Sequence, residues 1–202
     1  MAGNNKLIHA LNKYLADFQE AEPEKMAELA EGRWEPPNIY LPFLNGEVAV
    51  NWETGAVTPE TPSILEHILI LKYLLAAQGM DAALESDEYI AFRQLPYGSH
   101  HLNAFKAEVL NPLAAAFGGD LPGFAAAAQA LGGVKAPGGD LAYTIPYFPK
   151  IGLRIIIWQA DEEFPAQSAF LFNKRSQFHM DTDGLNELAN SLTAILLREA
   201  GK

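Results

Sequence analysis

Residues 145–173 read IPYFPKIGLRIIIWQADEEFPAQSAFLFN, and this stretch decides the fold. Runs of Ile, Phe, Tyr and Trp, residues that favour strands, predict one strand at 142–148, a second at 152–159 and a third at 168–173. The short connection PKIG joins the first two. Because LRIIIWQ is apolar on both faces except at Arg154, we expect the second strand to lie at the centre of a sheet and to be covered on both sides.

The amino-terminal part of the chain combines helices with a separate set of strands. An apolar stripe at helical spacing predicts an amphipathic helix around 7–18, and a second helix is expected over 23–32. Asn45-Gly46, which follows an apolar run, is the signal of a hairpin with a type I′ turn, because both residues tolerate positive φ. Gly55 allows a further turn into a short third strand.

Further helices are expected over 63–79, 102–117, 122–131 and 185–196. The first of these is apolar nearly all round, so it is predicted to be the buried central helix. Helices and strands come in runs, without strict βαβ alternation. The predicted class is therefore α+β, with a mainly antiparallel sheet made of an N-terminal hairpin or meander and the C-terminal strands, packed with about five helices.

Composition and charge exclude several classes of partner. The chain has 202 residues, 49% hydrophobic and 19% charged, and we expect one globular domain over 1–202, with a helical segment at 1–34 and a core at 35–202. The net charge of −11 disfavours binding to nucleic acid or to an anionic membrane surface. Without cysteines there is no disulfide and no thiolate ligand or nucleophile. The absence of an apolar span of roughly 18 residues and of a secretory signal predicts a cytoplasmic protein.

Three consecutive acids, Asp161, Glu162 and Glu163, follow Trp158 at the end of the second predicted strand. Carboxylates at such a position suit a hard cation or an acid–base pair, although a cation site needs about six oxygens from several segments. The alternative is a solvated turn in which Phe164 folds inward. We favour the turn, because surface loops are polar for reasons of solvation alone.

His100 and His101 stand at a predicted junction between a loop and a helix. One of the two imidazoles could ligate a metal together with carboxylates from elsewhere in the chain. Adjacent histidines lack the i, i+4 spacing that places two imidazoles on one helix face. A capping or surface role is therefore favoured.

The segment HMDTDGLNELAN resembles the middle of a calcium-binding EF-hand loop, but His179 and Asn190 stand where acidic ligands are required. Asp181, Thr182 or Asp183 is predicted instead to cap the last helix. The glycine pairs match neither GxxxxGKS/T nor GxGxxG, and there is no GxSxG motif. A P-loop enzyme, a Rossmann dehydrogenase and a serine hydrolase are therefore unsupported.

The segments ILILKYLLAAQG, YIAFRQLPYGS and FKAEVLNPLAAAFGGD, together with the stretch 145–173, resemble the domain-of-unknown-function family 3786 of anaerobic bacteria and archaea. The resemblance covers roughly residue 38 to the C-terminus. Its most specific part is a proline-bounded strand, a tryptophan strand ending in D-E-E-F-P-A, and a strand ending in L-F. Those residues are Pro146, Pro149, Trp158, Asp161, Glu162, Glu163, Phe164, Pro165, Ala166, Leu171 and Phe172.

The resemblance also carries expectations about function. The family usually has Asp where this chain has Asn173, so any role of that carboxylate as ligand or base is lost here. Some relatives carry an additional iron–sulfur domain like that of corrinoid proteins, which implies a link to corrinoid or iron–sulfur metabolism. The cysteine-free chain lacks that domain.

Three functions stay open at this point. The first, which we predict, is a non-catalytic module that binds a ligand or a protein partner, with a pocket or signature at Trp158, Asp161, Glu162, Glu163, His100 and His101. The second is a metal-dependent or acid–base enzyme that combines the acid cluster with the histidine pair. The third is a homodimer that associates through an exposed apolar patch around Tyr143, Tyr147 and Phe148. No cofactor or resident metal is assigned.

Overall fold

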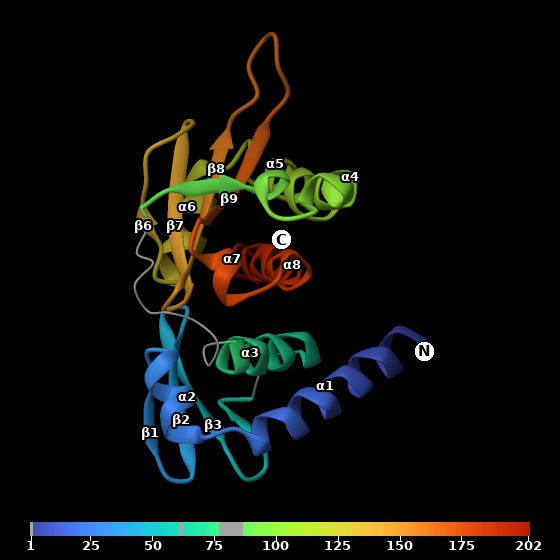
Figure 1. Ribbon diagram of the computed structural model, residues 1–202. Coiled ribbons are helices and arrows are strands. Elements are labelled where there is room, and N and C mark those ends of the chain that lie inside the picture. Colours follow the sequence, from blue (N-terminus) through green and yellow to red (C-terminus); the bar gives the residue numbers. More distant parts are fainter. Residues whose placement is uncertain (1, 61–62, 77–86) are drawn as a thin grey trace.

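The computed structural model describes residues 2–60, 63–76 and 87–202, and it confirms the α+β class (Figure 1). Its strands form two antiparallel sheets, where the sequence predicts one. The N-terminal meander makes a sheet of its own, beside α1 and α2. The C-terminal strands make the second sheet. The two sheets meet where the tip of the first hairpin reaches β7, and Leu44 N donates to Tyr147 O over 3.1 Å.

The first sheet has the strand order β1-β2-β3-β4. Its strands are β1 (Arg33–Glu35), β2 (Asn38–Phe43), β3 (Gly46–Asn51) and β4 (Val57–Thr58). The helices beside it are α1 (Ala2–Glu20), α2 (Pro23–Leu29) and α3 (Ile64–Ala76). The predicted end of the third helix, at Gly79, lies outside the described residues.

The second sheet has the order β5-β9-β8-β7-β6, so the prediction that the tryptophan strand is central is confirmed. Its strands are β5 (Tyr89–Ala91), β6 (Val134–Lys135), β7 (Leu141–Phe148), β8 (Ile151–Trp158) and β9 (Gln167–Asn173). Its helices are α4 (Leu102–Phe105), which continues through a π-helical stretch (Lys106–Leu110) into α5 (Asn111–Phe117), then α6 (Leu121–Ala130), α7 (Ser176–His179) and α8 (Thr182–Glu199). Asp181 caps α8, as predicted, by accepting a hydrogen bond from Gly184 N.

The first hairpin forms where it was predicted, but its loop is shifted by one residue. Phe43 pairs with Gly46, so the two loop residues are Leu44 and Asn45, and Leu44 takes the left-handed conformation with φ of 51°. Tertiary contacts explain the shift. The Asn45 amide donates to the backbone of Ala130, and the Phe43 ring packs edge-on against Tyr147 with centroids 5.3 Å apart.

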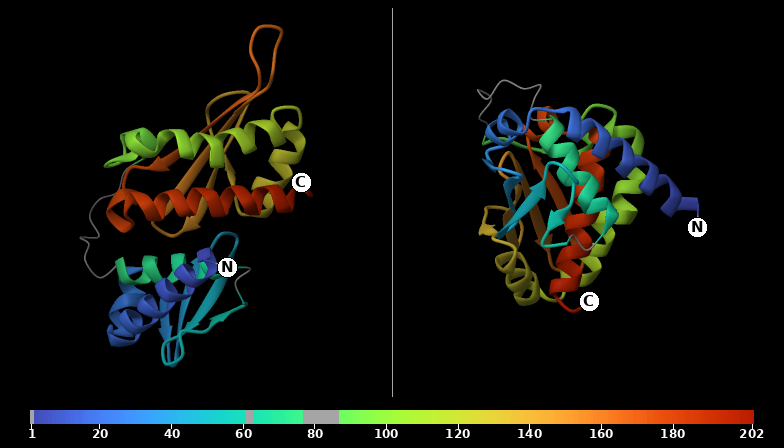
Figure 2. Two further views of the ribbon diagram at one scale, coloured as in Figure 1. Left: turned by 90° about the vertical axis from the view of Figure 1, so that its right-hand side faces the viewer. Right: turned by 90° about the horizontal axis from the view of Figure 1, so that it is seen from below.

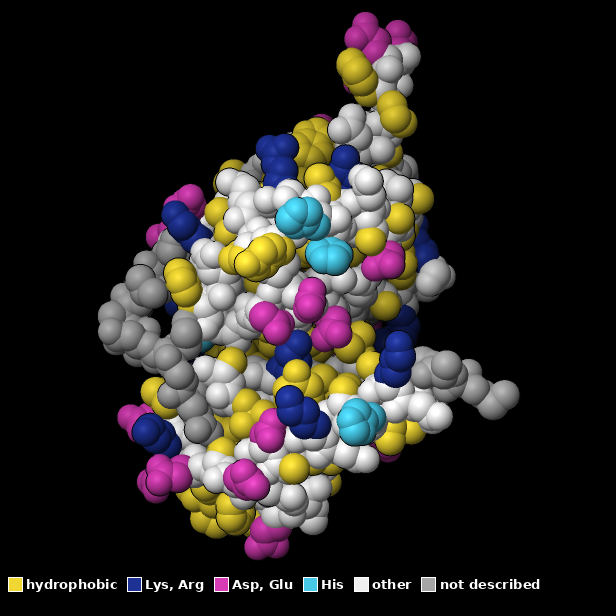
Figure 3. Space-filling model, turned by 45° about the vertical axis from the view of Figure 1, so that its right-hand side comes forward, with side chains coloured by type: hydrophobic (Ala, Val, Ile, Leu, Met, Phe, Trp, Pro, Cys, Tyr) yellow, Lys and Arg dark blue, Asp and Glu magenta, His cyan; other side chains and the backbone are white. Residues whose placement is uncertain are grey.

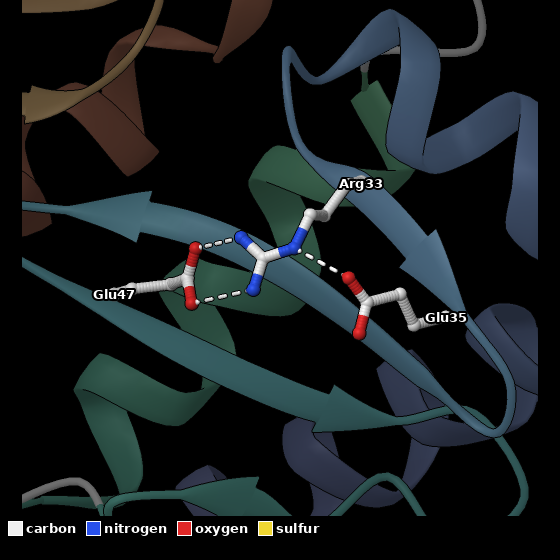
Figure 4. A network of polar contacts seen from close by, with 3 residues as sticks. All are labelled: Arg33, Glu35 and Glu47. Atoms are coloured by element: carbon white, nitrogen blue, oxygen red, sulfur yellow. Dashed lines mark hydrogen bonds and ion pairs between the residues drawn. The ribbon is translucent and has the colours of Figure 1, made fainter.

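An exposed ion-pair network ties the strands of the first sheet together (Figure 4). Arg33 of β1 donates to Glu35 on its own strand at 2.8 Å, and its guanidinium forms a two-pronged contact with Glu47 of β3. The guanidinium also lies over the Tyr40 ring, 4.3 Å from its centroid. Because these charges are exposed, we expect them to add little stability and mainly to fix the orientation of β1.

The central helix α3 is buried as predicted, between the first sheet and α8 (Figure 2). The second sheet differs from its prediction, because β8 is not covered on both faces. Ile151, Leu153, Ile155 and Ile157 face the helices and are fully buried, whereas Trp158, on the other face, is 39% exposed. Among the residues that the structure describes, the loop at Gly138 covers part of that face by packing against Ile156.

The two halves of the molecule are joined at the hydroxyl of Tyr73 in α3. It donates to Ala30 O at 3.1 Å, after α2, and accepts from Lys150 N at 3.2 Å, in the turn between β7 and β8. The Lys150 ammonium donates to Leu29 O at 2.6 Å. The Tyr73 ring stacks on Phe148, with centroids 4.4 Å apart. Burial raises the pKa of Tyr73 well above its ordinary value, so the hydroxyl keeps its proton.

We predict that Tyr73→Phe lowers the free energy of unfolding by about 1–3 kcal/mol, because it leaves a buried amide and a buried carbonyl without a partner. Urea denaturation measures the change. Tyr40→Phe is the matched control, since within the described residues its half-buried hydroxyl makes no hydrogen bond, and its effect should stay within about 0.5 kcal/mol. Equal effects of the two substitutions would contradict the role of the Tyr73 hydroxyl.

Candidate functional site

The acidic signature lies on an arm that projects from the second sheet. We call residues 158–167, the loop between β8 and β9 with its two flanking residues, the arm. It extends beyond the helices that cover the sheet (Figure 1), and its tip carries acidic and apolar side chains (Figure 3). Asp161, Glu162 and Glu163 are all exposed there.

Asp161 shapes this loop by binding its backbone. Its Oδ1 accepts hydrogen bonds from Glu163 N at 2.8 Å and from Phe164 N at 2.7 Å, while Asp161 N donates to Phe164 O at 2.9 Å. The carboxylate therefore serves the turn, which supports the turn interpretation of the acid cluster. Glu162 and Glu163 make no side-chain hydrogen bond or ion pair with the described part of the chain, so their charges face solvent.

The aromatic side chains of the arm are exposed, and the expectation that Phe164 folds inward is wrong. Phe164 is 58% exposed and Trp158 is 39% exposed. Gly118, just after the end of α5, packs against Ala166 at the base of the arm. The end of α5 therefore lies level with the base of the arm, and the tip of the arm extends beyond it. A cavity of about 320 Å³ lies beside the arm and is lined by Trp158, Phe164 and Pro165, among others.

The histidine pair lies on a different part of the molecule. His100 and His101 are exposed in a short 3₁₀ turn (Gly98–His101) that precedes α4. Tyr97, just before the turn, has a left-handed φ of 61° and is 78% exposed. His101 lines a second cavity, of about 440 Å³, together with Asp181 and other residues near the start of α8.

The structure does not bring the acids and the histidines together. The helical segment over 102–117 begins right after His101 and ends next to Gly118, which touches the arm, and at about 1.5 Å per residue it spans about 24 Å. Two ligands of one metal ion must lie within about 5 Å of each other. No group of three His, Asp or Glu side chains in the described ranges could hold a metal ion.

Two further expectations concern residues of β7 and β9. Tyr143, Tyr147 and Phe148 are 4%, 0% and 1% exposed, so the apolar patch expected around them does not exist on the surface. They belong to the core, because the aromatic side chains of β7 point towards the helices. Asn173 is also buried, and its Oδ1 accepts a hydrogen bond from Arg175 N at 3.0 Å, which makes it part of the turn after β9.

The sequence marks His179 only as a residue that breaks the EF-hand pattern and predicts no role for its side chain. In the structure it is 6% exposed, and its Nδ1 finds no hydrogen-bond partner in the described part of the molecule. Burial, reinforced by the positive charges of Lys150 and Arg175, lowers the pKa of His179 to about 4. The folded protein therefore holds a neutral imidazole beside the Tyr73–Lys150 junction.

This depressed pKa predicts a pH dependence of stability. Between about pH 6.5 and 4 the unfolded chain binds a proton at His179 that the folded protein does not, so stability is lost as the pH falls through that window, by up to about 3 kcal/mol. The difference in unfolding free energy between wild type and His179→Asn, measured from pH 7 to pH 4, should follow this curve. His9→Asn, at an exposed site, is the control and should keep the wild-type slope. A slope unchanged in His179→Asn would contradict the assignment.

The two hydrogen bonds of Asp161 predict a local effect. Asp161→Ala should speed amide hydrogen exchange at Glu163 and Phe164 roughly fivefold, the effect of losing about 1 kcal/mol per bond, and should leave the melting temperature unchanged. Asp161→Asn keeps an acceptor oxygen and should exchange like wild type. Exchange that is equally slow in all three proteins would show that another interaction holds the loop.

Comparisons with known proteins add the family. A search of curated proteins and a search of solved structures each found no match. No helix in the described ranges is long and apolar enough to cross a membrane. A family model covers residues 22–194, which include the arm, the Tyr73 junction and both sheets. The chain belongs to the family described as a domain of unknown function, DUF3786.

Proposed function

We propose that this protein is a non-catalytic binding module that docks on a protein partner through the arm. The observation that carries the proposal is the 58% exposed ring of Phe164 on a loop whose shape is held by hydrogen bonds to Asp161. Burying a Phe side chain is favourable by about 1.5–3 kcal/mol. A partner with an apolar pocket recovers that free energy on binding.

The shape of the arm lowers the cost of association. A loop already held by its own backbone hydrogen bonds, with Pro165 next to Phe164, loses little conformational freedom when it binds. Glu162 and Glu163 present negative charge beside the ring, which favours a partner whose pocket is rimmed by Lys or Arg and speeds the encounter. The association of relatives with corrinoid iron–sulfur domains makes a corrinoid or iron–sulfur protein the first partner to test.

Site-specific crosslinking tests the proposal. With a photoreactive phenylalanine analogue at position 164, irradiation in the native cells should give one defined adduct, identified by mass spectrometry. The same analogue at Phe178, 43% exposed on α7, is the matched control and should not give that adduct. With the purified partner, Phe164→Ala should weaken binding about 30-fold, the effect of losing about 2 kcal/mol at a central contact.

Other outcomes decide against the proposal or change the partner. If position 164 gives no adduct, or gives the same adducts as position 178, the arm is not a docking element. An adduct with the mass of two chains would show that the arm binds a second copy, and the homodimer would replace the proposed partner. Glu162→Gln with Glu163→Gln should reduce the association rate several-fold at low salt and much less at high salt.

A further inference from the structure

A second possible binding site lies between α3 and α8, remote from the arm. A cavity of about 340 Å³ opens there, with the apolar side chains of Leu65 and Ile195 and the polar side chains of Glu66, Ser191 and Arg198 in its wall. This volume is in the range of small-molecule sites. Neither the family nor the proposed function assigns a role to it.

Glu66 is the unusual residue of this cavity. It is only 4% exposed, and no Lys or Arg of the described chain forms an ion pair with it. Its Oε1 accepts a hydrogen bond from Ser191 at 3.3 Å, and its Oε2 has no protein donor. An unsatisfied buried carboxylate oxygen is costly, so the geometry calls for a donor from outside the chain.

The hydrogen bonds around Ser191 show which hydroxyl donates to which acceptor. The Ser191 hydroxyl has one proton, and it goes to Glu66 Oε1. The buried hydroxyl of Tyr147, 2.9 Å from Ser191 Oγ, must therefore donate to Ser191. The hydroxyl protons of Ser191 and Tyr147 are then both used, and neither is left for Glu66 Oε2. The group that satisfies Oε2 has to carry its own N–H or O–H.

Arg198 narrows the class of ligand. Its exposed guanidinium lines the same cavity from the last turn of α8 and makes no ion pair or side-chain hydrogen bond within the described ranges. A cation in the wall disfavours a purely cationic ligand such as a polyamine, and it matches a carboxylate well. The apolar contributions of Leu65 and Ile195 suit a hydrocarbon side chain.

We propose that this cavity binds a small aliphatic α-amino acid, whose ammonium donates to Glu66 Oε2 and whose carboxylate pairs with Arg198. The proposal is independent of the arm, since the two sites lie on different elements. The proposal is one of binding alone, in which no bond is made or broken.

Thermal unfolding of the full chain with L-leucine and the other proteinogenic amino acids is the first test. A ligand at about 100 times its Kd should raise the melting temperature by about 5–10 °C. Isoamylamine, which lacks the carboxylate, and 4-methylpentanoate, which lacks the ammonium, should each give a much smaller rise. Calorimetric titration then gives the Kd of the best amino acid.

Substitutions assign the two contacts. Glu66→Gln keeps the shape and an acceptor for Ser191 but removes the charge, and it should abolish the rise. Arg198→Ala, at an exposed position, should weaken amino-acid binding about tenfold and remove the preference over isoamylamine. Arg93→Ala, an exposed arginine on another element, is the control and should bind like wild type.

The proposal is overturned if no amino acid raises the melting temperature of wild type, which would mean that Glu66 Oε2 stays without a donor in the folded protein. It is also overturned if Glu66→Gln responds like wild type, or if isoamylamine binds as tightly as leucine. Should Glu66→Gln fail to fold, the comparison of Arg198→Ala with Arg93→Ala still decides. Failure here leaves the crosslinking result at Phe164 untouched.

Discussion

The hydroxyl of Tyr73 is the contact on which the arrangement of the two halves depends. It binds at once a carbonyl after α2 and an amide in the β7–β8 turn, segments that lie 43 and 77 residues away in the sequence. Both bonds are buried, so neither group can exchange its partner for water. The same turn carries Lys150, whose ammonium is held by Leu29 O, and this fixed positive charge helps to keep His179 neutral. One polar cluster thus sets the position of the sheets and the titration of a buried side chain.

The elements of the second sheet could be predicted from the sequence because they depend on local composition. The strands around Ile155 and Phe170 are apolar enough that no other element competes, and the cap at Asp181 follows from its position before an apolar stripe. What could not be predicted depends on distant partners. The loop of the first hairpin is shifted because Asn45 binds near the end of α6, and no property of Asn45-Gly46 encodes that contact.

The candidate site shows the same limit. An apolar residue next to a strand predicts burial, yet burial also requires a helix layer long enough to cover the strand. The layer stops at Gly118, so Phe164 lies beyond it, whereas Tyr147 lies well inside. Tyr147, which was expected on the surface, is therefore buried, and Phe164, which was expected to be buried, is exposed. The acids of the arm form the predicted turn because the hydrogen bonds of Asp161 involve only the backbone of residues two and three positions later in the chain.

Glu66 makes one hydrogen bond to a neighbour in the sequence and one to a distant residue. Its backbone amide donates to Ser63 Oγ at 3.2 Å at the start of α3, whereas its carboxylate accepts a hydrogen bond from Ser191 on α8. The cap uses only the backbone amide of Glu66, so it does not explain why the carboxylate is buried at a cost to folding. A ligand at Oε2 would offset that cost and would at the same time bridge α3 and α8, which belong to different halves of the molecule. Because the arm lies on neither helix, an occupied cavity would stiffen the body and still leave Phe164 free to dock.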